Sequence, residues 1–311
     1  MKRIFSAILA AGALLMTLSA CGSSAGRGAL ENRTGAEAQE VLTSDVSLET
    51  SKEAPKIRVV ALMESVGEMW LLAGGELVGI TEDGTGLSGL SEDVATIGTT
   101  HNPNLEAILA LKPDIVIISN SVSAQTELIP VFEEAGIKVY APEINSFEDY
   151  ADTLKEYTAL TNRPDLYEKN VLKVQEEIEA VKAKADSSVK ASYLAVRVSA
   201  TKNRVLKDDY FACKIISDLG LKNIAEDNSS LDELNVEAIA AADPEYIFVV
   251  LQGKEDEALD SYKKALTDNP VWGSLSAVKN DKVFILPKDM FQYKPNARWG
   301  EAYEYIYELV Y

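Results

Sequence analysis

The sequence predicts two similar α/β lobes joined by one long helix. Three observations support this fold class. From residue 57 onward, short β-branched runs alternate with helical stretches, a 15-residue segment recurs 131 residues later, and a single narrow apolar stripe lies between the two copies. The 311 residues, 47% of them hydrophobic and 25% charged, have the balance of a globular protein long enough for two domains.

Residues 1–20 predict a lipoprotein signal peptide. Lys2 and Arg3 precede an almost wholly apolar run that is too short to span a bilayer. The sequence Leu-Ser-Ala-Cys that ends at Cys21 is similar to a bacterial lipobox, which implies cleavage before Cys21 and acylation of its sulfur; the alternative is a plain secretory signal. Residues 22–56 contain no aromatic residue, so 21–56 is predicted to be a flexible tether that holds an extracytoplasmic body at the cell membrane.

Charge and cysteine content exclude several classes of protein. The formal charge is −19, and it becomes −21 without residues 1–20, whose only charges are Lys2 and Arg3, so nucleic acid is excluded as a partner. One histidine and two cysteines exclude a cysteine-rich zinc module and a disulfide framework. Cys213 lies in a segment whose pattern predicts an amphipathic helix, which favours buried, inert packing of its thiol.

The predicted N-terminal lobe covers residues 57–162. Its β-branched runs are typical of buried parallel strands, and Gly74 and Gly136 mark helix ends. The predicted elements are a strand at 57–62, a helix at 65–73, a strand at 114–119, a helix at about 124–135 and a strand at 138–141. The C-terminal lobe, 188–311, is predicted by the same patterns. Its elements are strands at 192–199, 245–251 and 282–286, a helix around 211–219 and a final helix at about 296–309.

An internal repeat indicates that the two lobes have related architecture. Asn104–Ile118 matches Asn235–Val249 without a gap, and six of the 15 positions are identical. Each copy predicts a helix, then a proline (Pro113 or Pro244), then a strand.

The segment from Pro164 to Asp186 predicts one long helix. Its apolar residues recur at spacings of three and four, which places them on one narrow stripe, at Tyr167, Val171, Val174, Ile178, Val181 and Ala185. A stripe this narrow favours a helix that lies over a surface, so residues 163–187 are predicted to connect the lobes. The alternative is an ordinary helix within one lobe.

Two longer segments resemble a known family. Thr96–Ile118 and Asn269–Leu286 are similar to the first-lobe and second-lobe signatures of the substrate-binding lipoproteins of bacterial ABC importers for iron-siderophores, haem and cobalamin. With the lipobox and the long helix, the resemblance covers about residues 57–311. It implies two Rossmann-like lobes, a ligand cleft between them, limited hinge bending and a monomer. It also implies delivery of the ligand to a membrane permease driven by an ATPase, with no catalysis and no cofactor.

In open α/β sheets the ligand lies beyond the carboxyl ends of the strands. In the first lobe this rule predicts a site with Met63, Glu64, Thr100, His101 and Asn120, beside Ser121. His101, the one histidine, either coordinates haem iron, donates a hydrogen bond to a chelate, or caps the next helix. Met63 is either an axial ligand or a core residue.

In the second lobe the predicted site residues are cationic or aromatic. Arg197 interrupts an apolar strand and is predicted to contact an anion, helped by Lys207 in a basic cluster with Lys202 and Arg204. Phe291 and Tyr293 are predicted to form a wall of the cleft and Arg298 to bind the ligand by pairing with a carboxylate. The alternatives are a solvated basic loop for the cluster and helix packing for Arg298 and Trp299.

Glu106 and Glu237 occupy matching positions in the repeat. The resemblance implies that such an acidic residue on each lobe meets arginines of the permease. The alternative is that each carboxylate only stabilises the amino end of its helix.

The resulting hypothesis is a binding protein for an iron chelate, a ferric siderophore. The nearest alternative is a haem or cobalamin binder, and a zinc or manganese binder is disfavoured because those sites use several histidines. From other classes, a lipoprotein hydrolase that uses His101 or an adhesin remains open, although no hydrolase motif is present.

Overall fold

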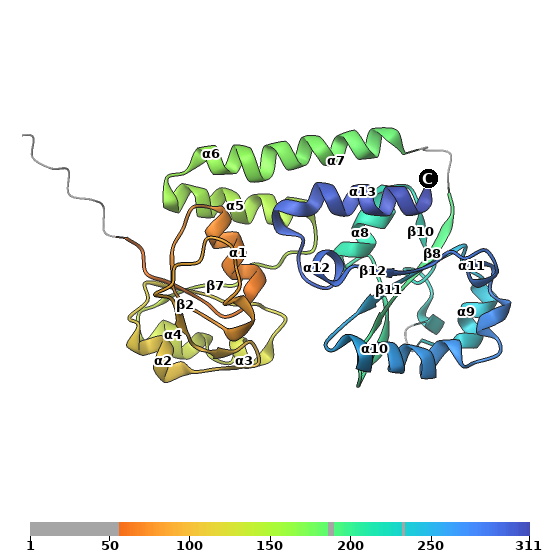
Figure 1. The fold of residues 1–311 in the computed structure, drawn as a ribbon, viewed down its shortest axis with the longest axis horizontal. Helices are drawn as coiled ribbons and strands as arrows, with labels where there is room; N and C mark the ends of the chain where they lie inside the picture. Colours follow the sequence, from red (N-terminus) through yellow and green to blue (C-terminus); the bar gives the residue numbers. More distant parts are fainter. Residues whose placement is uncertain (1–55, 186–189, 232–233) are drawn as a thin grey trace, which may run out of the picture. The chain divides into compact units, whose positions relative to one another are not determined.

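The computed structural model describes residues 56–185, 190–231 and 234–311, which belong to one compact unit, Glu53–Tyr311. Within this unit the chain forms two regions, each built on its own mainly parallel sheet, and helices α6 and α7 run along both (Figure 1). The predicted fold class is therefore confirmed. The predicted signal peptide, Cys21 and nearly all of the predicted tether lie outside the described residues, as does the lobe boundary at residue 187.

The N-terminal sheet has five parallel strands in the order β3-β2-β1-β6-β7. The strands are β1 (Val59–Ala61), β2 (Leu77–Ile80), β3 (Ala95–Thr96), β6 (Ile115–Ile117) and β7 (Lys138–Tyr140). A small antiparallel pair, β4 (Gly98–Thr99) and β5 (Asn102–Pro103), follows β3. The helices of this region are α1 (Glu64–Leu72), α2 (Leu105–Ala110), α3 (Ser123–Thr126), α4 (Ile129–Glu134) and α5 (Phe147–Thr161).

The C-terminal sheet has the parallel order β10-β8-β11-β12, and β9 pairs antiparallel with the second half of β8. The strands are β8 (Ser192–Val198), β9 (Asn203–Leu206), β10 (Lys222–Asn223), β11 (Tyr246–Leu251) and β12 (Val283–Leu286). The helices are α8 (Phe211–Asp218), α9 (Val236–Ala242), α10 (Glu255–Tyr262), α11 (Ser276–Lys279), α12 (Lys288–Phe291) and α13 (Trp299–Val310).

The sequence repeat corresponds to a structural repeat. The order β2-β1-β6-β7 in one sheet matches β10-β8-β11-β12 in the other, and the repeated segments supply α2 with β6 and α9 with β11. Both helices begin in the same way. The side chain of Asn104 accepts a hydrogen bond from the Ala107 amide at 3.1 Å, and that of Asn235 accepts one from the Ala238 amide at 3.0 Å.

A single apolar core lies under both sheets. Along β1 and β8, alternate residues face opposite sides, so Val59 and Tyr193 join this shared core while Val60 and Leu194 face a separate core in each region. Trp299, which is fully buried, connects the two halves: its ring lies 6.1 Å from that of Phe147 and 5.9 Å from that of Phe211. The helices over the sheets therefore share one interior.

The predicted long helix is present from Pro164 to Lys184. It consists of α6 (Pro164–Tyr167), a π-helical turn (Glu168–Leu172) and α7 (Lys173–Lys184). The predicted apolar stripe is confirmed at its centre, where Val171, Val174, Ile178 and Val181 are all buried. The Asn170 amide donates to the Leu72 carbonyl at 2.7 Å, and Lys184 pairs with Glu304 of α13 at 3.1 Å, so the helix is attached to both regions.

The structure corrects two expectations and adds one helix. The helix predicted at 124–135 is two short helices, because Pro130 has no amide hydrogen to continue the ladder of hydrogen bonds. The final α-helix begins at Trp299 and not at Asn296, because Asn296 has a left-handed backbone with φ of 50°. Helix α5 was not predicted, although Ser146 caps it and Glu148 and Asp149 occupy its first turn.

Candidate functional site

A cavity of about 970 Å³ lies between the two sheets. On the N-terminal side it is lined by loops that follow the carboxyl ends of strands: Met63 follows β1, Thr100 and His101 follow β4, and Ser119 and Ser121 follow β6. This is the edge at which open α/β sheets bind ligands. Its volume lies near the upper end of the range for small-molecule sites, so it can accept a bulky ligand.

The C-terminal side of the cavity is rich in cations. Strands β8 and β9 present Arg197 and Arg204, and the loop after β9 presents Lys207. Lys202 of the hairpin turn and Lys294 after α12 also line it. Two carboxylates, Asp83 and Asp209, are the acidic groups of the lining, so positive charge predominates there in a strongly acidic chain.

Arg197 and Arg204 face each other directly across the antiparallel pair β8–β9. Burial, and then the neighbouring Arg204, lowers the pKa of Arg197 below its ordinary value. The Arg197 guanidinium lies 5.8 Å from the centre of the Tyr210 ring, and among the described residues neither arginine has a carboxylate within ion-pair distance. Like charges opposite each other in a sheet are unfavourable, so this pair favours an anion from outside the chain.

Lys294 is a site residue that the sequence analysis missed. Its ammonium group is largely buried at the cavity, lies 4.5 Å from the centre of the Phe211 ring, and donates a hydrogen bond to the Ile144 carbonyl of the other region. The pKa of Lys294 is lowered from 10.5 to about 8, mainly by burial; Asp149 and Glu143 oppose this shift, and Arg197 adds a smaller lowering. Lys294 thus adds a further cation to the cavity and contacts both regions.

Replacing Lys294 by methionine is expected to change the pH dependence of stability. The unfolded chain keeps this proton up to about pH 10.5 while the folded chain loses it near pH 8, so the wild type should gain stability relative to the variant as the pH rises through that window. The gain should approach about 3 kcal/mol. Urea unfolding at pH 7 and at pH 10.5 measures it. Lys288→Met is the matched control, because Lys288 also donates to a carbonyl, that of Gly253 at 2.6 Å, but in a hydrogen bond that is exposed to solvent. Parallel pH profiles of the wild type and Lys294→Met would contradict the expectation.

Several predicted site residues lie where the sequence analysis placed them. Met63, Thr100, His101, Arg197, Lys207 and Tyr293 all line the cavity. Tyr293 has a raised pKa because it is partly buried and because Glu64 and Asp83 lie nearby. The binding roles of these residues stay predictions.

Four predicted site residues do not line the cavity. Phe291 is fully buried in the shared core, and Asn120 donates to the Ala141 carbonyl at 2.7 Å. Arg298 points to carboxylates of its own region, Asp289 at 2.6 Å and Glu301 at 2.8 Å, which is the helix-packing alternative.

The fourth of these residues, Glu64, begins α1. It is half-buried, and its pKa is raised by burial, by Asp83 and by Glu68. The backbone amide of Glu64 donates to the Asp83 side chain at 2.9 Å. Asp83 lines the cavity, whereas Glu64 does not.

The structure also shows the surroundings of the remaining candidates. Glu106 and Glu237 are exposed in the first turns of α2 and α9, and among the described residues neither carboxylate has an ion-pair partner. Cys213 is fully buried, and burial raises the pKa of its thiol, as inert packing requires.

Across residues 56–185, 190–231 and 234–311, no group of three or more His, Cys, Asp or Glu side chains is arranged to hold a metal ion. In the same part of the chain, no helix combines the length and the apolar character needed to cross a bilayer.

Comparison with solved structures identifies the same fold in proteins of known ligand. Staphylococcus aureus IsdE complexed with heme is 20% identical with a TM-score of 0.72, and the match covers 82% of this chain and 99% of that one. The vitamin B12 binding protein BtuF of Vibrio cholerae is 21% identical with a TM-score of 0.65, over 81% of this chain and 95% of that one.

Sequence comparison gives matches over nearly the whole chain. The iron-uptake system-binding protein of Bacillus subtilis is 24% identical over 301 residues, 94% of this chain and 92% of the relative. The Fe(3+)-citrate-binding protein YfmC of the same organism is 25% identical over 291 residues, 88% and 86% of the two chains. The periplasmic binding protein family matches residues 59–290, which include both sheets and the helix between them. This chain therefore belongs to the periplasmic binding protein family.

Proposed function

We propose that this protein captures an anionic ferric chelate outside the cytoplasm and delivers it to the permease of an ABC importer. The observation that carries the proposal is a pair of arginines, Arg197 and Arg204, at a large cavity that Lys207 and Lys294 also line; among the described residues neither arginine has a carboxylate partner. Relatives named for iron uptake and for Fe(3+)-citrate binding support this class of ligand, and relatives named as ABC transporter substrate-binding lipoproteins support the lipid anchor at Cys21.

A thermal-shift screen tests the proposal. Purified protein would be heated with ferric catecholate, ferric hydroxamate and ferric citrate chelates, with haem, with cobalamin and with iron alone. A ligand at 100 times its dissociation constant stabilises the fold by about 2.7 kcal/mol, so one anionic chelate should raise the melting temperature clearly. The proposal fails if no ferric chelate shifts the melting temperature.

Haem is the second candidate, because Met63 and His101 line the same cavity and can supply soft and imidazole ligands to iron. Visible spectra recorded during the screen separate the two candidates. Haem binding gives an intense absorption band that should change in His101→Ala, whereas binding of an anionic chelate through the arginines should survive that substitution.

The hydrolase alternative has less support. The family comprises substrate-binding transport proteins. Loss of ester or peptide turnover in His101→Ala would be the result that revives it, because a general base is required for turnover and not for binding.

We also propose that Glu106 and Glu237 dock the protein on its permease. They lie at equivalent positions of the two repeats, so they can meet a permease of two similar halves. Glu106→Arg and Glu237→Arg are each expected to lower stimulation of ATP hydrolysis by the reconstituted transporter by about tenfold, while the affinity for the ligand is unchanged. Glu133→Arg, an exposed reversal on α4, is the control, and equal loss in all three variants would contradict the docking role.

A further inference from the structure

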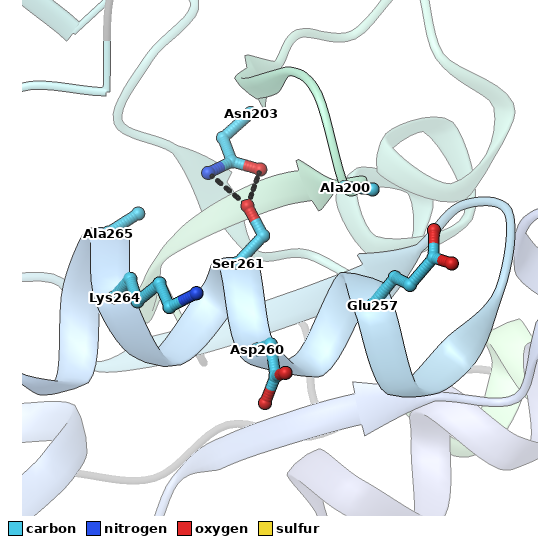
Figure 2. Close-up of a pocket in the computed structure, with 7 residues that line it drawn as sticks. All are labelled: Ala200, Asn203, Glu257, Asp260, Ser261, Lys264 and Ala265. Carbon is cyan, nitrogen blue, oxygen red and sulfur yellow. Dashed lines mark hydrogen bonds between the residues drawn. The ribbon is translucent and has the colours of Figure 1, made fainter.

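The hairpin formed by β8 and β9 is bordered by hollows. Lys202 and Arg204 of the hairpin line the large cavity. A second hollow of about 470 Å³ lies between the hairpin and α10, where Ala200 and Asn203 face Glu257 and Ser261 (Figure 2). The second hollow is open to solvent, so the turn end of the hairpin is held by fewer packing contacts than its buried residues Val196, Val198 and Val205.

The same hairpin carries an unfavourable charge pair. Arg197 of β8 lies opposite Arg204 of β9, and the next pair toward the turn is Val198 opposite Asn203. Repulsion between the two guanidinium groups acts to separate the strands, and it is strongest before an anion is bound. Arg197 is half-buried and Arg204 is exposed, so water screens part of this repulsion; a contact that holds the two strands together would oppose the rest when the site is empty.

Asn203 supplies such a contact. Its side-chain nitrogen donates to the Ser261 hydroxyl at 3.1 Å, and that hydroxyl donates back to the Asn203 side-chain oxygen at 3.2 Å (Figure 2). The same oxygen accepts a hydrogen bond from the backbone amide of Ser199, which follows β8 on the other side of the turn, at 3.3 Å. The side-chain amide of Asn203 thus connects the two ends of the hairpin turn to each other and connects the turn to α10.

We propose that Asn203 is a positioning residue of the ligand site. Through Ser261 it holds β9 against α10, so that Arg197 and Arg204 are both presented to the cavity before an anionic ligand arrives. The claim that this contact prepares the site for an anionic ligand rests on the proposed function. The claim that the contact holds β9 against α10 does not. Preorganisation of this kind raises affinity because the ligand does not have to order the hairpin.

The test is Ser261→Ala, which removes the contact from the α10 side and leaves every hairpin residue in place. Thr267→Ala is the matched control: it removes an exposed hydroxyl that bonds only within its own helical segment, to the Lys263 carbonyl. Hydrogen exchange of the amides of residues 203–206 is measured in the wild type, in both variants and in the double variant Ser261→Ala/Arg204→Gln. Affinity for the chelate identified by the thermal-shift screen is measured in parallel.

In Ser261→Ala, exchange at residues 203–206 is expected to accelerate by about tenfold, and removal of the Arg204 charge should restore most of the protection. Chelate affinity should fall about threefold to tenfold in Ser261→Ala and stay unchanged in Thr267→Ala. Unchanged exchange in Ser261→Ala, or acceleration that Arg204→Gln does not reverse, overturns the inference. If exchange behaves as expected but no chelate binds the wild type, the proposed function fails while the positioning of the hairpin stands.

Discussion

The variant Arg197→Gln is expected to bind an anionic ferric chelate about tenfold to a hundredfold more weakly than the wild type. Arg197 is half-buried at the cavity and no carboxylate competes for it among the described residues, so its hydrogen bonds to an anionic ligand are charge-assisted. Such bonds contribute about 1.5–3 kcal/mol, which gives the expected change in affinity. Quenching of intrinsic fluorescence by the ferric ligand measures the dissociation constant.

The control for Arg197→Gln is Arg163→Gln. Arg163 pairs with Asp165 at 2.7 Å on the surface, away from the cavity lining, so its loss should not affect binding. Repeating both measurements at high salt adds a second criterion, because the wild type should lose more affinity with salt than Arg197→Gln. Equal affinity and equal salt dependence in the wild type and Arg197→Gln would place the anion site elsewhere.

Gly75→Ala is expected to lower the free energy of unfolding by about 2–3 kcal/mol. A Cβ at this position would overlap the Cε2 and Nε1 atoms of Trp70 and lie 2.6 Å from its Cδ2. The indole cannot move aside easily: it is 2% exposed, donates to the Glu76 carbonyl at 3.0 Å and packs edge-on against Tyr157, 5.4 Å away. Thermal and urea unfolding measure the loss, which corresponds to roughly 5–10 °C in melting temperature.

Gly86→Ala is the control for Gly75→Ala. Nothing lies within 4 Å of a Cβ at Gly86, and its backbone is not left-handed. The methyl group there should raise stability by about 0.4–1 kcal/mol, because it restricts the unfolded chain. The two substitutions are chemically identical and opposite in expected sign, so a loss at Gly86 equal to that at Gly75 would show that steric overlap with Trp70 is not the cause.

The sequence predicted those parts of the fold that depend on local pattern. The repeat of Asn104 and Asn235 indicated two related units because an asparagine cap, a proline and an apolar strand are all local features. The stripe through Val174 and Ile178 likewise predicted a long helix over a surface, since apolar spacing determines which side of a helix is buried. Helix α5 carried a comparable local signal in Ser146 and the acidic residues after it, so it was predictable in principle.

The site was predicted less well. Whether a residue belongs to it depends on the direction in which its side chain points, and the local sequence pattern does not determine that direction. Arg197 stood out as a charge in an apolar strand, and the rule for strand ends indicated Met63 and His101. Lys294 and Arg298 are both cations of one short segment, yet one faces the cavity and the other pairs with Asp289. Between them Asn296 has a left-handed backbone, which asparagine tolerates better than most residues, but the residue type alone does not predict that this particular asparagine adopts it.

The shared core beneath the two sheets has a consequence for how this protein unfolds. Trp299 packs against Phe147 from one region and Phe211 from the other, so neither region can lose its interior without exposing apolar surface of its neighbour. Residues 53–311 should therefore melt in one cooperative transition, with calorimetric and van't Hoff enthalpies that agree. A ligand that touches both regions would then raise a single melting temperature. A destabilising substitution in one region, such as Gly75→Ala, would also lower the stability of the other region.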